Sequence, residues 1–409
     1  MHRFRQVILR VVHQPAFAGL LATNFALGLA FSFVTPFMSM WGTLSVGMTP
    51  HVFGLFMTIT SLSGIGLSLL LARWSDTHVA RRTMLIVGAL GGLAGYAGYA
   101  FVRDPVLLTI IGSLALGVST VNFSQLFAYA REELARPENI GADRPLLMSL
   151  VRVFFSLAWI IGPAIGAAVM IRFSYRGIFL AAAGLFLVFL LGVLRFVPHR
   201  PHAPAARRAP RESLLRVLSR PVIIAHFTGL VLVFAAFNMN LLNLPLLVTQ
   251  QLGGTARDVG VIFGIAPIVE IPLMIWFGKL AARGHQVALL RFGVFATVCY
   301  FLALTFVTAP WHVYPMQILS AISIAITTNV AITFFQDLLP AQTGVATSIY
   351  SNSFGLGSLL GYLAFGSLVG VLGHRGLFFV CAALCGVTFV VFMLYRHESS
   401  FGRPAGAAS

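Results

Sequence analysis

The chain has 409 residues, of which 58% are hydrophobic and 9% charged, with a net charge of +16. Soluble proteins carry about 25% charged residues, so this composition excludes an ordinary soluble enzyme, a disordered chain and a disulfide-stapled scaffold. The 36 Phe and 39 Gly are typical of lipid-solvated helices, in which Gly is tolerated and permits close packing. The sequence therefore predicts an all-α membrane protein.

Apolar stretches of about 20 residues, the length that crosses a bilayer as a helix, occur twelve times. In the first half we expect transmembrane helices at residues 16–41, 53–72, 83–102, 105–127, 146–171 and 177–197. In the second half we expect them at residues 221–247, 258–278, 288–309, 311–337, 342–372 and 376–395. Several exceed the minimal length, which predicts tilt or bending.

The longest polar interruption, residues 198–220, is rich in Pro, Arg and Ala and predicts a flexible linker. It separates an N-terminal six-helix bundle, 1–197, from a C-terminal bundle with a short tail, 221–409. The tripeptide TVN at 120–122 recurs as TTN at 327–329, the connection at 72–82 has a weaker counterpart at 278–285, and Pro36 corresponds to Pro245. The three offsets of 207, 206 and 209 residues together indicate an internal duplication. Two six-helix pseudo-repeats around a central cavity are a transporter architecture.

Basic residues are distributed unevenly between the two predicted sides of the membrane. Of the 27 Lys and Arg, 21 fall on one side and five on the other, which predicts that both termini are cytoplasmic. The positive charge is thus a topology signal, and we expect no nucleic-acid partner. The three cysteines lie in predicted membrane helices without a neighbouring His or acid, so we expect no metal and no cofactor.

Two short motifs resemble those of the major facilitator superfamily. The connection between the second and third predicted helices is similar to the family pattern G-x-x-x-D-x-x-x-x-R-R, with Ala72 in place of the Gly, through Asp76, Arg81 and Arg82. The fifth predicted helix contains AWIIGPAIGA (158–167), which resembles the Gly-Pro motif of exporters in this superfamily.

Longer stretches in both halves resemble the bacterial sugar efflux transporter family. They are SQLFAYAREELA (124–135), RVFFSLAWIIGPAIG (152–166), VEIPLMI (269–275) and FFQDLLPAQTGVATSIYSNSFGLG (334–357). The resemblance implies a major facilitator fold in which helices 1, 4, 7 and 10 line the cavity. It also implies a monomeric, multi-pass protein of the bacterial inner membrane that exports small sugars or glycosides.

Two ionisable residues lie inside predicted helices, where each costs about 2.5–3.5 kcal/mol. Arg152 in helix 5 and Glu270 in helix 8 lie roughly 9 and 12 Å deep from the same side at 1.5 Å per residue. The resemblance implies that these helices face each other, so we expect a pair that loads and releases a proton. The alternatives are a permanent ion pair that fixes helix packing, and Asp337 as the partner of Arg152.

Uncharged polar side chains concentrate on the helices that the resemblance places around the cavity. Amides both donate and accept hydrogen bonds, as a neutral polyol requires, and an indole can stack on a sugar ring. The alternative is ordinary interhelical hydrogen bonding. The predicted substrate ligands are Asn24, Asn122, Gln125, Trp159, Asn238, Asn240, Asn243, Asn329, Gln336, Tyr350 and Asn352.

The resemblance also implies a cytoplasmic gate. Asp76 is expected near the start of helix 11, where the helix end attracts an anion, and Arg81 or Arg82 is expected to reach an acid at the inner end of helix 4. In helix 5, Pro and Gly permit a bend or simply close packing. The full set of gating candidates is Asp76, Arg81, Arg82, Glu132, Glu133, Gly162, Pro163 and Gly166.

Together these observations predict an exporter of small sugars that works by alternating access, with protons as the antiported ion. A drug exporter of the same superfamily is the closest alternative. A membrane-embedded enzyme would need a nucleophile–base pair or converging metal ligands, and the sequence offers no such constellation. The two-half design and the closing loop argue against a passive pore.

Overall fold

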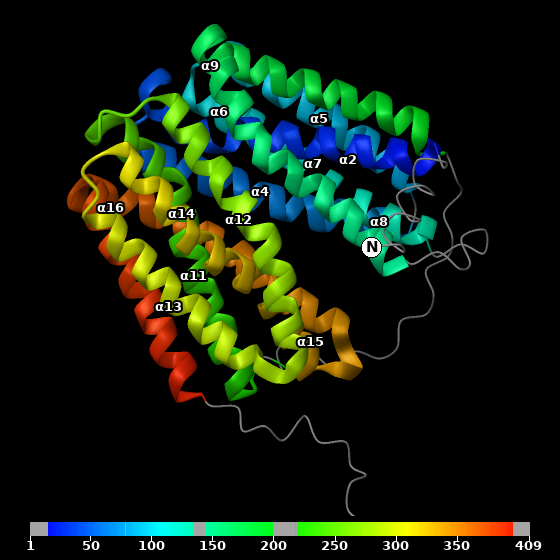
Figure 1. Ribbon diagram of the computed structural model, residues 1–409. Helices are drawn as coiled ribbons and strands as arrows, with labels where there is room; N and C mark the ends of the chain where they lie inside the picture. Colours follow the sequence, from blue (N-terminus) through cyan, green and yellow to red (C-terminus); the bar gives the residue numbers. More distant parts are fainter. Residues whose placement is uncertain (1–14, 78, 135–143, 199–216, 218, 396–409) are drawn as a thin grey trace, which may run out of the picture. The chain divides into compact units, whose positions relative to one another are not determined.

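The computed structural model describes residues 15–77, 79–134, 144–198, 217 and 219–395, and in these ranges every regular element is helical (Figure 1). Nine helical stretches of this part are long and apolar enough to cross a membrane. Most of the predicted linker lies outside the described residues. The prediction of an all-α membrane protein is confirmed.

Three of these stretches, Leu150–Phe196, Ala256–Thr305 and Thr343–Leu394, contain 47, 50 and 52 residues. A straight helix of 50 residues would be about 75 Å long, far beyond a bilayer. Each stretch has one internal residue outside the helical region, namely Ser174 (φ 59°), Gly284 (φ 90°) or Gly373 (φ 68°). These breaks fall between helices that the sequence predicts as separate. The count of twelve crossings stays a prediction.

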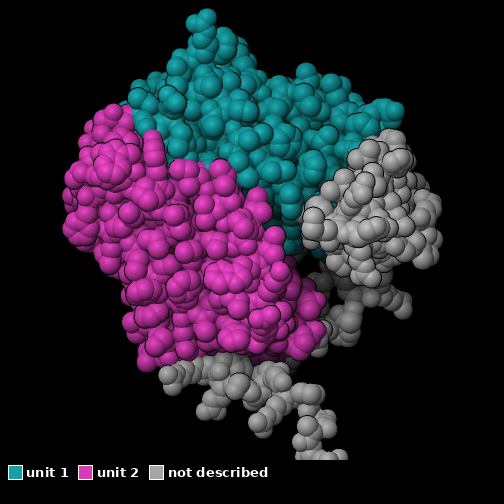
Figure 2. Space-filling view, viewed as in Figure 1, with its two compact units in different colours: residues 1–207, 255–264 teal, residues 208–254, 265–409 magenta. Residues whose placement is uncertain are grey.

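The described helices belong to two compact units, drawn in different colours in Figure 2. Unit 1 comprises residues 1–207 and 255–264, and unit 2 comprises residues 208–254 and 265–409. The sequence-based boundary assigns 255–264 to the second bundle, whereas the contacts of these residues place them in unit 1. The reason is local packing: a Cβ on Gly260 would lie 2.8 Å from the carbonyl oxygen of Pro163.

In chain order, the α-helices of unit 1 are α2 (Pro15–Val34), α3 (Met38–Met40), α4 (Pro50–Thr77), α5 (Arg81–Phe101), α6 (Pro105–Ile111), α7 (Gly117–Ser119), α8 (Val121–Leu134) and α9 (Arg144–Phe196). Unit 2 contains α11 (Pro221–Leu246), most of α12 (Ala256–Leu280), α13 (Gln286–Thr305), α14 (Pro310–Ala325), α15 (Ala331–Leu338) and α16 (Thr343–Leu394). Several helices run on through single π-helical turns, such as Ile326–Val330 between α14 and α15.

Unit 1 is held together by the close approach of α2 to α9. A Cβ on Gly166 would lie 2.7 Å from the carbonyl oxygen of Phe33, and one on Gly162 would overlap the Ser32 hydroxyl. The Ser32 hydroxyl donates a hydrogen bond to the carbonyl of Ala158 at 2.9 Å. Glycine in α9 therefore supplies the space for this helix pair, and the packing role predicted for Gly162 and Gly166 is what their contacts describe.

Unit 2 uses the same device between α11 and α16. A Cβ on Gly357 would lie 2.9 Å from the carbonyl oxygen of Val231, and one on Gly361 would lie 2.5 Å from that of Ala235. The two glycines are four residues apart, as Gly162 and Gly166 are, so each pair lies on one helix face. Both units therefore contain a close helix pair of this kind, and the predicted duplication stays a prediction.

Candidate functional site

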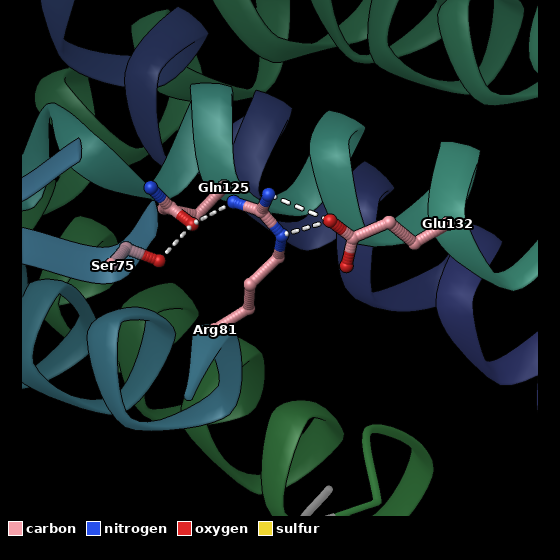
Figure 3. A network of polar contacts seen from close by, with 4 residues as sticks. All are labelled: Ser75, Arg81, Gln125 and Glu132. Carbon is pink, nitrogen blue, oxygen red and sulfur yellow. Dashed lines mark hydrogen bonds and ion pairs between the residues drawn. The ribbon is translucent and has the colours of Figure 1, made fainter. Parts of the chain in front are cut away.

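A polar network joins α4, α5 and α8 of unit 1 (Figure 3). The Arg81 guanidinium donates to Glu132 Oε1, with Nε at 2.7 Å and a second nitrogen at 2.6 Å, and a third nitrogen donates to Gln125 Oε1 at 2.9 Å. The Ser75 hydroxyl donates to the same Gln125 oxygen at 3.0 Å. The expected contact between the loop arginines and the acids of helix 4 is thus present, and its role as a gate stays a prediction.

Arg82, the neighbouring basic residue, donates to the carbonyl of Leu194 at 3.0 Å, near the C-terminal end of α9. A guanidinium there complements the partial negative charge of the helix end. Arg291 of unit 2 does the same for α16, donating to the carbonyl of Phe392 at 2.9 Å. Arg82 therefore serves helix capping in this structure. Glu133 is half-buried in α8.

Asp76 lies near the C-terminal end of α4, and its side chain is outside the described residues, as are the N-terminus and the tail. The expected contact of its carboxylate with the start of helix 11 therefore stays a prediction.

Unit 2 contains a counterpart of the Arg81–Glu132 pair. Gln286 at the start of α13 donates from Nε2 to Asp337 Oδ2 in α15 at 2.5 Å. The two residues are 51 positions apart, as Arg81 and Glu132 are. Asp337, expected as an alternative partner of Arg152, is therefore engaged by a neutral side chain of its own unit. The equal spacing was visible in the sequence and could have identified Gln286.

Glu270 lies in α12 between Pro267 and Pro272 and is half-buried. Among the described residues of its own unit it has no hydrogen bond and no ion pair. The two prolines lack N–H groups, so the carbonyls four residues earlier lose their helical donors and this part of α12 is weakened. Arg152 is exposed in α9 of unit 1. A pair between them would join the two units, each of which is described by itself, and it stays a prediction.

Asn329 links the α14–α15 stretch to α12. Its Nδ2 donates to the carbonyl of Met274 at 3.0 Å, and a Cβ on Gly278 would lie 3.4 Å from that nitrogen. Glu270, Met274 and Gly278 are four residues apart and share one face of α12. Asn329 itself lies in the π-helical turn Ile326–Val330, an irregularity that is frequent at functional sites.

Most other candidate amides of unit 2 use their N–H groups on protein atoms. Asn240 donates to the Tyr300 hydroxyl at 3.4 Å, and Asn243 donates to the carbonyl of His374 at 2.8 Å while its oxygen lies 2.7 Å from the His374 ring Nδ1. Tyr300 and His374, which the sequence analysis missed, carry no motif that reveals them. The remaining candidates here are Asn238, bonded to the Phe234 carbonyl, Gln336, bonded to Thr347, the half-buried Tyr350 and the exposed Asn352.

The unit 1 candidates are similarly occupied. Asn24 is fully buried and donates to the carbonyl of Val151 at 2.6 Å. Asn122 is also fully buried, and a Cβ on Gly88 of α5 would overlap its amide, so this side chain is directed at α5. Trp159 is half-buried. These contacts match the alternative of interhelical hydrogen bonding for Asn24, and the role of the whole set as substrate ligands stays a prediction.

The sequence matches the Major Facilitator Superfamily over residues 20–351. The chain belongs to this superfamily. It is 33% identical over 377 residues to a putative sugar efflux transporter of Deinococcus radiodurans, which covers 90% of this chain and 95% of that protein. It is 30% identical to sugar efflux transporter A of Dickeya chrysanthemi, over 90% of this chain and 92% of that protein.

Among solved structures, the nucleoside transporter NupG shares the fold with a TM-score of 0.80 at 13% identity, covering 94% of this chain and all of that one. This member of the major facilitator superfamily is therefore a multi-pass membrane transporter and not an enzyme. The predicted resemblance to the superfamily and to sugar efflux transporters is confirmed.

Proposed function

We propose that this transporter exports small sugars or glycosides by alternating access. The observation that carries the proposal is its 33% identity to a putative sugar efflux transporter across 95% of that protein's length. The Asn and Gln side chains within the predicted membrane helices support it, because an amide oxygen can accept a hydrogen bond from a sugar hydroxyl while its N–H group holds a neighbouring helix. The protein acts as a monomer in the bacterial inner membrane, with both termini in the cytoplasm.

Proton antiport supplies the energy, and Glu270 is the proton acceptor. A carboxylate within a membrane helix is costly when charged, so it is protonated unless a cation or water reaches it. Its lack of a hydrogen bond or ion pair to the described residues of unit 2 supports a residue that changes its protonation state. Pairing with Arg152 in one conformation favours proton release, and separation of the two favours proton uptake.

Contacts at the cytoplasmic ends of the helices stabilise the conformation in which the cytoplasmic side is closed. The Arg81–Glu132 pair ties α5 to α8, and the Gln286–Asp337 bond ties α13 to α15. Each tie fixes the ends of its own bundle, so that each bundle moves as a rigid body. Asp76 acts from the adjoining end of α4, Gly162 and Gly166 let α9 pack closely against α2, and Pro163 allows a bend in α9.

The proposal is tested in proteoliposomes by counterflow of labelled sugars and of labelled cationic drugs, each with and without a pH gradient. Without a pH gradient we expect sugar exchange only. With a pH gradient that drives protons in the direction opposite to the sugar, we expect sugar accumulation. Drug exchange in the absence of sugar exchange would assign the chain to drug export. Glu270→Gln is expected to keep exchange and lose gradient-driven accumulation, and unchanged accumulation would remove Glu270 from coupling.

A further inference from the structure

We propose that Asn329 is the positioning residue that couples substrate binding on the α14–α15 stretch to the Glu270 segment of α12. This inference rests on the proposed function, because it takes Glu270 as the proton acceptor and a polyol as the substrate. It concerns two helices of unit 2, and it assigns the two ends of one amide to two different partners.

The first end of the amide is fixed by the protein. A backbone carbonyl only accepts hydrogen bonds, so the 3.0 Å contact with Met274 requires Nδ2 of Asn329 to point at α12. The amide oxygen then points away from that carbonyl, and no hydrogen bond to it occurs among the described residues. A carbonyl-type oxygen on a half-buried side chain is an acceptor suited to a sugar hydroxyl. One side chain thus offers its oxygen to substrate and its N–H group to α12.

The second partner is the weakened part of α12. Met274 lies one turn after Glu270 on the same helix face, and Pro272 lies between them. Pro272 leaves the carbonyl of Ile268 without its helical donor, so the turn that carries Glu270 bends more easily than an intact helix. Movement of the Met274 carbonyl therefore bends α12 at Pro272, and this bend rotates Glu270.

Space for this link is provided on both helices. Gly278 has no side chain where the Asn329 amide approaches α12, and a Cβ there would already be in contact at 3.4 Å. On the other helix, the π-helical turn Ile326–Val330 contains Asn329. A π-helical turn interrupts the regular hydrogen bonding of the α-helix around it, and helices bend at such turns. The link therefore joins two helix segments that are both able to move.

Unit 1 contains a matched control. Asn122 occupies the equivalent place in the repeated tripeptide, 207 residues earlier, and its amide is directed at Gly88 of α5 with no hydrogen bond to a described residue. The π-helical turn of this part of unit 1, Gly112–Leu116, ends before Asn122. Among the described residues, the same sequence element in unit 1 therefore has no counterpart of the Asn329–Met274 hydrogen bond. Asn122→Leu removes a buried amide and leaves the Asn329–Met274 bond unchanged.

The test compares two activities of the same proteoliposomes, sugar counterflow without a gradient and accumulation driven by a pH gradient. For Asn329→Leu, an apolar residue of similar size, we expect reduced counterflow, because an acceptor for a sugar hydroxyl is lost, and a ratio of accumulation to counterflow at least tenfold lower than in wild type. Asn329→Gln, which keeps the amide, is expected to restore part of the ratio. For Asn122→Leu, which removes another predicted substrate ligand, we expect the wild-type ratio of accumulation to counterflow, whatever its effect on counterflow itself or on protein yield.

Equal ratios for Asn329→Leu, Asn122→Leu and wild type would overturn the inference. If Asn329→Leu does not fold, Asn329→Ser is used, since its shorter side chain cannot span the distance to Met274 and the same loss of the ratio is expected. Glu270→Gln distinguishes a failure of the proposed proton coupling from a failure of the role inferred for Asn329. If it retains accumulation, Glu270 is not the proton acceptor, and that part of the proposed function is wrong. If it loses accumulation while the Asn329 variants retain it, only the role of Asn329 is wrong.

Discussion

The two units solve the same structural problem with different chemistry where the third and fourth predicted helices of each bundle meet. In unit 1, Arg81 forms a two-point ion pair with Glu132, and in unit 2, Gln286 donates one hydrogen bond to Asp337. Each residue of the second pair lies 205 positions after its counterpart. The acid is kept and the cation is replaced, so only unit 1 has an ion pair at this place that salt can screen.

A second difference lies at the breaks within the long helical stretches. Ser174 in α9 has φ 59° and ψ −170°, and Gly373 in α16 has φ 68° and ψ 175°. This backbone region is essentially restricted to glycine. Unit 2 therefore makes its turn with the residue suited to it, and unit 1 holds a serine there under strain. The comparison shows that equivalent turns tolerate a local cost when the surrounding helices fix the backbone.

The largest loss of stability is expected at the close helix pairs α2–α9 and α11–α16, a feature that the two units share. Gly162→Leu in unit 1 and Gly361→Leu in unit 2 force a side chain into Ser32 and into the Ala235 carbonyl, and each is expected to cost about 3 kcal/mol. Thermal unfolding in detergent measures this cost. Gly184→Leu, at a position of α9 with open space around it, is the control and is expected to be near neutral. Equal losses at all three positions would refute a packing role specific to the pairs.

The breaks give the next largest effect. Ser174→Gly is expected to stabilise the protein by about 1 kcal/mol because it removes the strain, and Gly373→Ser is expected to destabilise it by about 1–2 kcal/mol. Melting temperatures in one detergent should therefore move in opposite directions. A shift of the same sign for both variants would show that the two turns are not equivalent.

Removing the cation of unit 1 tests the polar network. Arg81→Gln removes the guanidinium from Glu132 and leaves the Gln125 oxygen with Ser75 as its donor, and we expect a loss of about 1 kcal/mol, since Glu132 is more than half exposed. The loss should shrink in 1 M salt, where the wild-type ion pair is itself screened. Arg131→Gln, on the same face of the membrane without a described partner, serves as the control. A loss that does not depend on salt would assign the effect to packing.

The smallest effect is the reverse exchange. Gln286→Arg would create in unit 2 the ion pair of unit 1, and we expect a gain of about 0.5 kcal/mol at low salt that disappears at high salt. Thermal unfolding over a salt series checks it. If the variant is less stable than wild type at low salt, the two places differ in more than the identity of the donor.

Several features of the chain followed from its sequence. Composition and the length of apolar stretches predicted an all-α membrane protein, because a membrane segment must satisfy its backbone internally and show an apolar surface to lipid. Residue motifs indicated the superfamily. The breaks at residues 174, 284 and 373 also fall between predicted helices, since short polar or small-residue interruptions are visible without knowledge of neighbours.

The directions of the polar side chains were decided by tertiary structure. Asn122 and Asn329 occupy the same place in a repeated tripeptide, yet one lies against Gly88 and the other is bonded to Met274. Either Arg81 or Arg82 was expected at an acid of helix 4; Arg81 contacts Glu132, and Arg82 donates to a carbonyl near the end of α9. Helical periodicity tells which residues share a face of one helix, whereas the partner depends on which helix lies opposite and how closely glycine lets it approach. That information belongs to the packed bundle and not to any single segment.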